Sequence, residues 1–235
     1  MIRTVWLDNP PVNAISADVI RAVQDAVERP GEETRVLVLR GRGERAFSAG
    51  ADIGGFRDSE GGARAIQQTA ALIEASPLPV VAAIHGFCLG GGLELALGCD
   101  VRVAHVDAQL GFPEVRLGLL PGGGGTQRAP RLVGRGRAAW LIMSGERIGA
   151  PQAETWGLVE VVVDDLDAGI ERVAGTLARQ SPSALRAIKE VLRETRDVRS
   201  DATEHTAFVR ALASPDGKEG VAAFLEKREP RWEGG

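Results

Sequence analysis

Two glutamates stand at positions where their carboxyl groups could do acid and base chemistry. Glu94 follows three consecutive glycines in "GFCLGGGLELALGCD" (86–100), and Glu114 lies in "LGFPEVRLG" (110–118). Two carboxyl groups that meet over one substrate can divide acid and base work, because their surroundings drive their pKa values apart. A predicted strand separates the two in the chain, so they are not neighbours on one helix. The pair predicts proton transfer if the fold brings both acids together.

Glycine-rich turns follow two of the predicted strands. "AFSAGADIGGF" (46–56) comes after a strand predicted at 34–41, and "GFCLGGG" (86–92) comes after a strand predicted at 80–86. A helix starting near Gly91 or Gly92 would expose free N–H groups at the positive end of its dipole. Glycine also lets a ligand approach the backbone closely. Two such turns on adjacent strands could direct two N–H donors at one oxygen, which is the geometry of an oxyanion hole.

Taken singly, each of these features also has a structural interpretation. Glu94 in the first turn of a helix would complement the helix dipole, and Glu114 could pair with Arg116 in a weak surface ion pair. The triple glycine could serve close packing of a helix on a strand, and "PGGGG" (121–125) could be a simple loop. The residues alone leave these interpretations open and name no reaction.

Other familiar sites are not indicated by the sequence. "PGGGGTQR" (121–128) lacks the Gly-Lys-Ser/Thr ending of a phosphate-binding loop, and "GFCLGGG" lacks the dinucleotide-binding spacing. The histidines at 85, 105 and 205 are too scattered to predict a zinc site or a catalytic triad, so no metal is expected. A net charge of -4 and a pI near 5.5 argue against nucleic acid or an anionic membrane as a partner.

The cysteines and the apolar stretches predict a cytoplasmic protein. Cys88 and Cys99 lie in apolar surroundings without metal or redox spacing, which favours reduced, buried thiols. The beginning of the sequence has no apolar run typical of a signal peptide, and no later segment approaches the roughly 20 apolar residues of a membrane span. We therefore expect no membrane partner.

The elements that must position the two acids follow a ββα rhythm. The apolar patterns predict strands at 4–8, 34–41, 80–86 and 99–106, and helices at 16–29, 61–76 and 90–98. Ser16 is the expected N-cap of the first helix. Residues 108–125 appear as an irregular glycine-rich segment, 125–145 as helical, and 146–163 as a helix running into a strand.

From Asp167 onward the pattern is helical, with helices predicted at 167–180, 181–195, 202–214 and 218–229. We therefore expect an α/β protein in which a spiral core at 1–166 contains the active site. A helical C-terminal region at 167–235 would follow it.

Three long runs of sequence strongly resemble the crotonase family, and specifically its enoyl-CoA hydratases. They are "AFSAGADI" (46–53), the run from "VVAAIHGFCLGGG" to "LPGGGGTQR" (80–128), and "GKEGVAAFLEKREPRW" (217–232). The likeness extends over nearly the whole chain. It implies a crotonase-like spiral of ββα units with a C-terminal helical trimerisation region, assembled as a homotrimer or as a hexamer made of two trimers.

The resemblance also implies roles for particular residues. In the family, the N–H groups at the positions of Ala51 and Gly91 hold the oxygen of a thioester. The two acids of the hydratases match Glu94 and Glu114, and the retention of both favours hydration over isomerase chemistry. Gly122 matches a glycine whose N–H helps to orient the catalytic water.

The mechanism implied by the resemblance is the addition of water to a 2-enoyl-CoA, which gives a 3-hydroxyacyl-CoA. Glu114 would exchange a proton with C2, and Glu94 would activate the water. No metal or redox cofactor is needed, since coenzyme A is part of the acyl-CoA thioester substrate. Phe224 and Lys227 match residues of the family's C-terminal helix that reach the coenzyme A bound by a neighbouring subunit.

Some alternatives stay open at the level of sequence. The same enolate could serve an isomerase, a decarboxylase or a hydrolase, and some relatives are non-catalytic scaffolds or RNA-binding proteins. Compared with the family, the sequence is short at its start by the first strand of the opening hairpin. Pro10 or Pro11 stands where some relatives carry a basic coenzyme A contact. The segment 54–68 differs widely between family activities, so the length of the acyl chain cannot be read from it.

Overall fold

A parallel sheet lies at the centre of the structure. The computed structural model describes residues 1–52, 61–194, 209 and 212–231. Among these residues, the larger sheet has five parallel strands in the order β1-β2-β4-β6-β9. Its strands are β1 (Ile2–Leu7), β2 (Val36–Gly41), β4 (Val80–Ile84), β6 (Val101–His105) and β9 (Val161–Val163).

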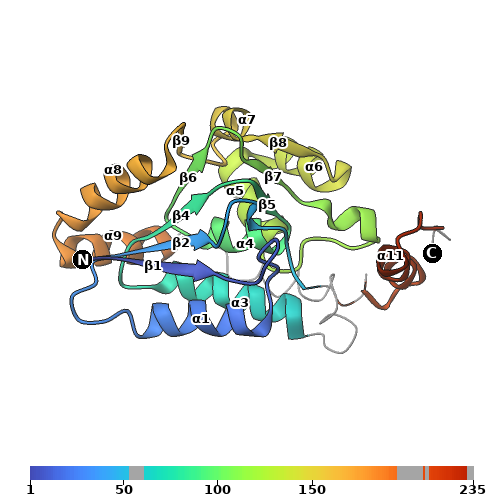
Figure 1. Cartoon of the computed structure of the whole chain (residues 1–235), viewed down its shortest axis with the longest axis horizontal. Helices are drawn as coiled ribbons and strands as arrows, with labels where there is room; N and C mark the ends of the chain where they lie inside the picture. The colour runs from blue at the N-terminus through green and yellow to red at the C-terminus, as the bar shows by residue number, and fades with distance from the viewer. Residues whose placement is uncertain (53–60, 195–208, 210–211, 232–235) are drawn as a thin grey trace.

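Both faces of this sheet are covered by helices, as Figure 1 shows. Helices α1 (Ala17–Glu28) and α3 (Gly61–Ala75) lie on one face, and α8 (Leu166–Ala178) lies on the other. Alternate residues of β2 belong to the two different hydrophobic clusters: Leu37 to the first and Val38 to the second. A strand buried on both faces has a continuous apolar sequence. This burial explains why β2 and β4 show no alternation of polar and apolar residues.

A second, smaller sheet contains the strands that lead into the two glycine-rich turns. Its strands run in the order β3-β5-β7-β8, with bounds β3 (Ala46–Ser48), β5 (Phe87–Leu89), β7 (Gln109–Gly111) and β8 (Arg147–Gly149). The first three are parallel, and β8 is antiparallel to β7. The pairs β2–β3, β4–β5 and β6–β7 each place one strand in the larger sheet and the next in the smaller. This repeat is the predicted spiral of ββα units.

Each pair of strands is followed in the chain by a helix that contributes residues to the candidate site. Helix α3 comes after β3 in the chain, α4 (Gly91–Gly98) follows β5, and η1 (Pro113–Leu117), a 3-10 helix, follows β7. The other helices with bounds in the described ranges are α5 (Gly125–Val133), α6 (Arg135–Ser144), α7 (Ala150–Trp156), α9 (Pro182–Glu194) and α11 (Pro215–Glu226). Helix α11 contacts η1 and lies at the end of the molecule away from α8 (Figure 1).

Most of the predicted elements form, and the differences have local causes. Ser16 caps α1 as predicted, since its Oγ accepts a hydrogen bond from the N–H of Val19 at 3.3 Å. The segment 108–125, expected to be irregular, contains β7 and η1, which are too short to give a periodic pattern. The helical stretch 125–145 is two helices, because Gly134 between them has a φ of 77°.

The helical C-terminal region is described in part. Helix α8 packs against the larger sheet, and α9 contacts α3. The helix predicted at 202–214 falls mostly outside the described residues. The division into a core at 1–166 and a helical region at 167–235 therefore stays a prediction.

Candidate active site

Two backbone turns meet at the edge of the smaller sheet. Strands β3 and β5 are parallel neighbours, so the turns that follow them lie at the same edge. Both turns depend on glycine. Gly50 has a φ of 114° and Gly90 a φ of 49°, and residues that carry a Cβ rarely adopt such positive values. A Cβ on Gly91 would lie 3.4 Å from the backbone nitrogen of Ala51. The two predicted donors are therefore adjacent in space.

The N–H groups of Ala51 and Gly91 are available to a ligand. Their chain neighbours are engaged: Asp52 N donates to Ile15 O at 3.1 Å, and Gly90 N donates to Gly111 O at 2.9 Å. Within the described part of the chain, Ala51 N and Gly91 N donate no such bond. Gly91 is the first residue of α4, where the N–H groups have no partner within the helix. Two unused donors beside each other can hold one oxygen that gains negative charge.

Glu94 lies in the first turn of α4 and is almost completely buried, with 2% of its surface exposed. Its Oε1 accepts hydrogen bonds from the N–H groups of Gly123 at 2.7 Å and Gly125 at 2.9 Å. A Cβ on Gly123 would come within 2.5 Å of the other carboxyl oxygen, Oε2. The "PGGGG" segment thus binds this carboxyl group through its backbone N–H groups. Glu94 therefore does more than complement the helix dipole.

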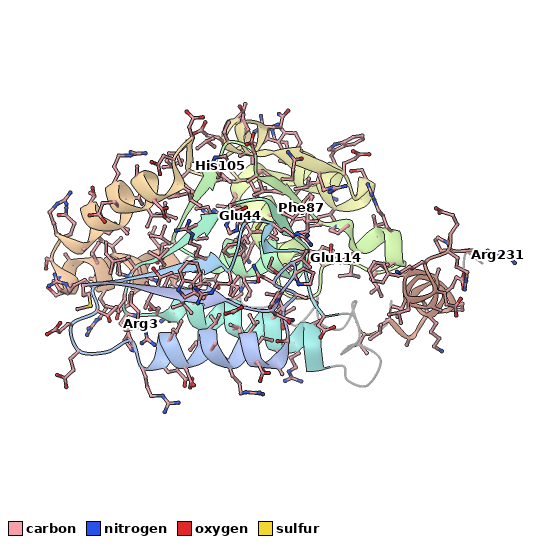
Figure 2. All side chains as sticks on the ribbon, viewed as in Figure 1. Arg3, Glu44, Phe87, His105, Glu114 and Arg231 are labelled. Carbon is pink, nitrogen blue, oxygen red and sulfur yellow. The ribbon has the colours of Figure 1, made fainter. Side chains whose placement is uncertain are left out.

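Glu114 reaches the same place from η1. Its Oε1 lies 2.8 Å from the position of a Cβ on Gly90, so the carboxyl group sits against the turn after β5. Figure 2 shows Glu114 on the side of the molecule that faces α11. The side chain lines the cavity that Glu94 also lines. The fold therefore brings together two acids that are twenty positions apart in the chain.

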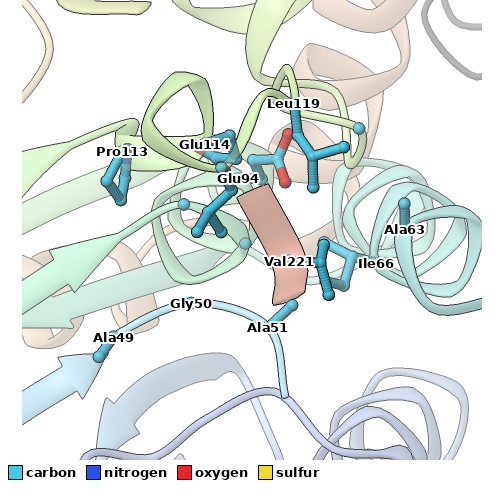
Figure 3. Close-up of a pocket in the computed structure, with 14 residues that line it drawn as sticks. Ala49, Gly50, Ala51, Ala63, Ile66, Glu94, Pro113, Glu114, Leu119 and Val221 are labelled. Atoms are coloured by element: carbon cyan, nitrogen blue, oxygen red, sulfur yellow. The ribbon is translucent and has the colours of Figure 1, made fainter. Parts of the chain in front are cut away.

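One cavity joins the acids and the donors, and Figure 3 shows Glu94 and Glu114 next to each other on one side of it. Gly50 and Ala51 lie across the cavity from them, and Ile66 and Val221 lie between. The cavity is lined by Ala49, Gly50, Ala51, Ala63, Ile66, Gly90, Gly91, Glu94, Pro113, Glu114, Leu117, Leu119, Gly122 and Val221. A mainly apolar wall with a few convergent polar groups is typical of a small-molecule site.

Burial raises the pKa of Glu94 to about 8, and the negative charge of Glu114 acts in the same direction. The N–H groups of Gly125 and Gly123 and the positive charge of Arg128 lower this pKa but do not outweigh the loss of hydration. The cavity therefore retains one carboxyl proton at neutral pH. Two carboxyl groups this close titrate as a unit, so the proton is best assigned to the pair.

Comparison with known proteins identifies the family. The whole chain, residues 1–235, matches the sequence model of the enoyl-CoA hydratase/isomerase family. The chain belongs to this family. A probable enoyl-CoA hydratase of Bacillus subtilis is 39% identical to it, with 99% of this chain and 95% of the relative covered. A crotonyl-CoA hydratase of Syntrophomonas wolfei is also 39% identical, with 97% and 93% covered.

Solved structures agree with the family assignment. The crystal structure of an enoyl-CoA hydratase from Bacillus anthracis is 36% identical and superimposes with a TM-score of 0.79, covering all of this chain and 96% of that one. The predicted crotonase-like fold and the prediction of an enzyme are thus confirmed.

The structure places the predicted site residues in two groups. Ala51, Gly91, Glu94, Glu114 and Gly122 all line the one cavity, although their roles stay predictions. Phe224 and Lys227, on α11, do not line this cavity. Phe224 is 54% exposed, and Lys227 is the C-cap of the helix.

Sequence reasoning missed several residues at this site. Gly123 and Gly125, which hold Glu94, were treated only as part of a glycine run. The apolar wall formed by Ala63, Ile66 and Val221 was also missed. Ala63 and Ile66 are three positions apart on α3, a spacing that predicts one helix face but not what that face meets.

The described ranges also bear on membrane spans, metal sites and disulfides. None of the helices there is long and apolar enough to cross a membrane. The same ranges hold no group of three or more His, Cys, Asp or Glu side chains placed to bind a metal ion. Cys88 and Cys99 are both buried and free of disulfides, as the sequence predicted.

Proposed function

We propose that this family member is an enoyl-CoA hydratase, which adds water across the double bond of a 2-enoyl-CoA and releases a 3-hydroxyacyl-CoA. The observation that supports it most is one cavity lined both by two carboxyl groups and by the two residues whose backbone N–H groups are unused in the described part of the chain. Hydration needs a proton donor and a proton acceptor near C2 and C3, together with a stabiliser for the thioester oxygen. The names of the relatives support the same reaction.

The backbone donors would carry the electrostatic part of the reaction. As water attacks C3, electrons move through C2 toward the thioester carbonyl, and negative charge develops on its oxygen. The N–H groups of Ala51 and Gly91 would bind this oxygen. One such donor typically contributes about 3 kcal/mol of transition-state stabilisation. The thioester needs no metal or redox cofactor in this proposal, because coenzyme A is already part of the substrate.

The two carboxyl groups would carry the protons. Glu94 would activate the water, and Glu114 would exchange a proton with C2, while the N–H of Gly122 would help to orient the water. The pair starts with one proton, gives one to C2 and receives one from the water, so it is unchanged after each turnover. For these steps the shared proton must be on Glu114 when the substrate is bound, which leaves Glu94 ionised to accept the proton of the water.

The assembly and the coenzyme A contacts belong to the same proposal. We expect a homotrimer, or a hexamer made of two trimers, in the cytoplasm. Phe224 and Lys227 of α11 would reach the coenzyme A bound by a neighbouring subunit. Pro10 and Pro11 are both exposed, and the basic contact that some relatives have at this position is replaced by proline.

The test is turnover of a small panel of acyl-CoA thioesters with product analysis. We expect hydration of crotonyl-CoA, abolished in Glu114→Gln and reduced by on the order of 100-fold or more in Glu94→Gln. Glu146→Gln is the matched control, because it makes the same change at an exposed side chain outside the cavity.

Each outcome of the panel has a distinct meaning. Full activity of both cavity variants would overturn the proposed mechanism. Isomerised, decarboxylated or hydrolysed products would move the assignment to another enolate chemistry. Tight acyl-CoA binding without any turnover would favour a non-catalytic role.

A further inference from the structure

Arg128 is a buried cation that the proposed mechanism does not use. It lies on α5, directly after the glycine loop, and only 3% of its surface is exposed. Glu74 on α3 holds it by a two-pronged ion pair, with Nε to Oε1 at 2.9 Å and Nη2 to Oε2 at 3.0 Å. This paired geometry fixes the plane of the guanidinium as well as its place.

The remaining donor of Arg128 points at the glycine loop. Its Nη1 donates to the carbonyl oxygen of Gly123 at 3.0 Å. The same residue, through its N–H, donates to Glu94 at 2.7 Å. Gly123 is therefore held from both sides, by the arginine at its carbonyl and by the glutamate at its N–H.

The neighbouring glycine shows how closely the arginine fills this space. A Cβ on Gly124 would collide with Nη1 of Arg128. The backbone nitrogen of Arg128 also donates to Gly124 O at 2.8 Å, so side chain and main chain of one residue fix successive carbonyls of the loop. A loop of four glycines has many accessible conformations, and it needs such external contacts to keep one of them.

We propose that Arg128, oriented by Glu74, is a positioning residue for Glu94: it locks the glycine loop so that the N–H groups of Gly123 and Gly125 stay aimed at the Glu94 carboxyl group. The inference rests on the proposed function, since it assigns Glu94 a part in catalysis. Arg128 acts through the loop and does not line the cavity.

The arrangement also sets the charges that Glu94 experiences. In the part of the chain that the structure describes, the charged groups that act on it are Glu114 on η1 and Arg128 on α5, with Glu74 on α3 paired to the arginine. The positive charge of Arg128 and the N–H bonds from the loop both favour the ionised carboxylate. Loss of Arg128 removes its positive charge and loosens the N–H groups of the glycine loop. Both changes disfavour the ionised carboxylate, so they raise the pKa of Glu94.

The test uses variants that keep the buried region neutral. Replacing one member of a buried ion pair leaves an unpaired charge and can prevent folding. The double variant Glu74→Gln/Arg128→Met removes both charges, and Arg128→Lys keeps the charge but cannot form the two-pronged bond. We expect both to lower kcat by on the order of 10- to 100-fold with KM nearly unchanged, as for a misplaced catalytic group.

A second buried pair provides the control. Arg102 is also 3% exposed, pairs with Glu160, and donates to the Cys99 carbonyl, directly after the far end of α4, at 2.9 Å. The variant Glu160→Gln/Arg102→Met should destabilise the fold similarly, because it removes a comparable pair. It should leave kcat near the wild-type value, because Arg102 does not touch the glycine loop.

The decisive measurement is the titration of the Glu94 carboxyl group, observed by NMR of 13C-labelled carboxyl groups. The Glu94 signal is identified by its absence in Glu94→Gln. We expect its midpoint to move to higher pH in the double variant at 74 and 128, and to stay unchanged in the pair at 102 and 160. A folded double variant with wild-type kcat and titration would overturn the inference. Because the titration needs no substrate, it remains informative if hydratase activity is absent.

Discussion

Glu94 combines burial with two backbone hydrogen bonds to one of its carboxyl oxygens, and this combination has a cost in stability that depends on pH. Its carboxyl group accepts two N–H groups of the glycine loop, yet its pKa is raised because loss of hydration outweighs these bonds. A group whose pKa is raised by folding keeps its proton in the native state when the unfolded chain has released it. The residue that makes the proposed chemistry possible therefore weakens the fold as pH rises from about 4.5 to about 8.

This cost predicts how Glu94→Gln changes stability. Between the ordinary pKa of 4.5 and the folded value of about 8, the native chain binds more protons than the unfolded chain, so the free energy of unfolding falls as pH rises. Glutamine has no proton to lose, and its amide oxygen can still accept both N–H bonds. We expect the variant to gain stability relative to the wild type from pH 5 to pH 8, by on the order of 3 kcal/mol.

Urea unfolding at pH 5, 6.5 and 8 measures this effect, with Glu146→Gln as the exposed control. The control should follow the wild-type pH dependence. If Glu94→Gln and the wild type lost stability in parallel across this range, the raised pKa would be wrong.

At the scale of elements, helix α11 packs against η1, the element that carries Glu114. Gly220 of α11 packs against the backbone of Leu117 on η1, and the next residue, Val221, lines the cavity. Val221 also belongs to a small hydrophobic cluster with Ala63 and Leu119. One helix of the C-terminal region thus closes the cavity formed by the ββα core.

This contact predicts the effect of Gly220→Ala. The added Cβ would collide with the carbonyl of Leu117, a backbone group that cannot rotate away, so α11 must move off η1. We expect kcat/KM to fall by on the order of 10-fold and α11 to become more sensitive to limited proteolysis.

Gly136→Ala is the matched control for this change. It also lies in a helix, α6, and an added Cβ there meets nothing within 4 Å. It should keep full activity and gain slightly in stability, since alanine is the better helix former. Equal behaviour of the two variants would show that close packing of α11 on η1 is unimportant.

At the scale of the whole molecule, the surface of the described residues suggests an assembly. Large apolar side chains are exposed on separate helices: Trp140 at 60% and Met143 at 76% on α6, and Leu192 at 68% on α9. Trp140 and Met143 are three positions apart on α6 and so share one face of this helix, and an apolar patch on one face is the kind of surface that marks a protein contact. Together with the trimer expected from the family resemblance, they support the proposed assembly of identical subunits.

Sedimentation equilibrium tests this assembly. We expect a mass of three or six chains of 24.8 kDa at micromolar concentration. A charged residue at an apolar contact opposes association, so the double variant Trp140→Lys/Met143→Glu should lower the mass. An active monomer in the wild-type protein would contradict the proposal that a neighbouring subunit contributes to coenzyme A binding.

The sequence by itself determined the family, the five strands that form the larger sheet, most of the helices, and the positions of the glycine turns. These features are local: an apolar run, an N-cap such as Ser16, or a glycine at a tight turn leaves its mark within a few residues. The two acids could be singled out in the same way. What Glu94 and Glu114 do together could not be derived from spacing, and their roles came from the family resemblance.

Only the tertiary structure decided that the two acids share one cavity with the N–H groups of Ala51 and Gly91. This convergence depends on the pairing of β3 with β5 and on the packing of η1 and α11, which join segments far apart in the chain. The same holds for Arg128: its bond to Glu74 spans 54 positions and leaves no periodic pattern. Contacts of this kind form only when the whole core is packed, because their geometry is set by the sum of many long-range interactions rather than by any local sequence.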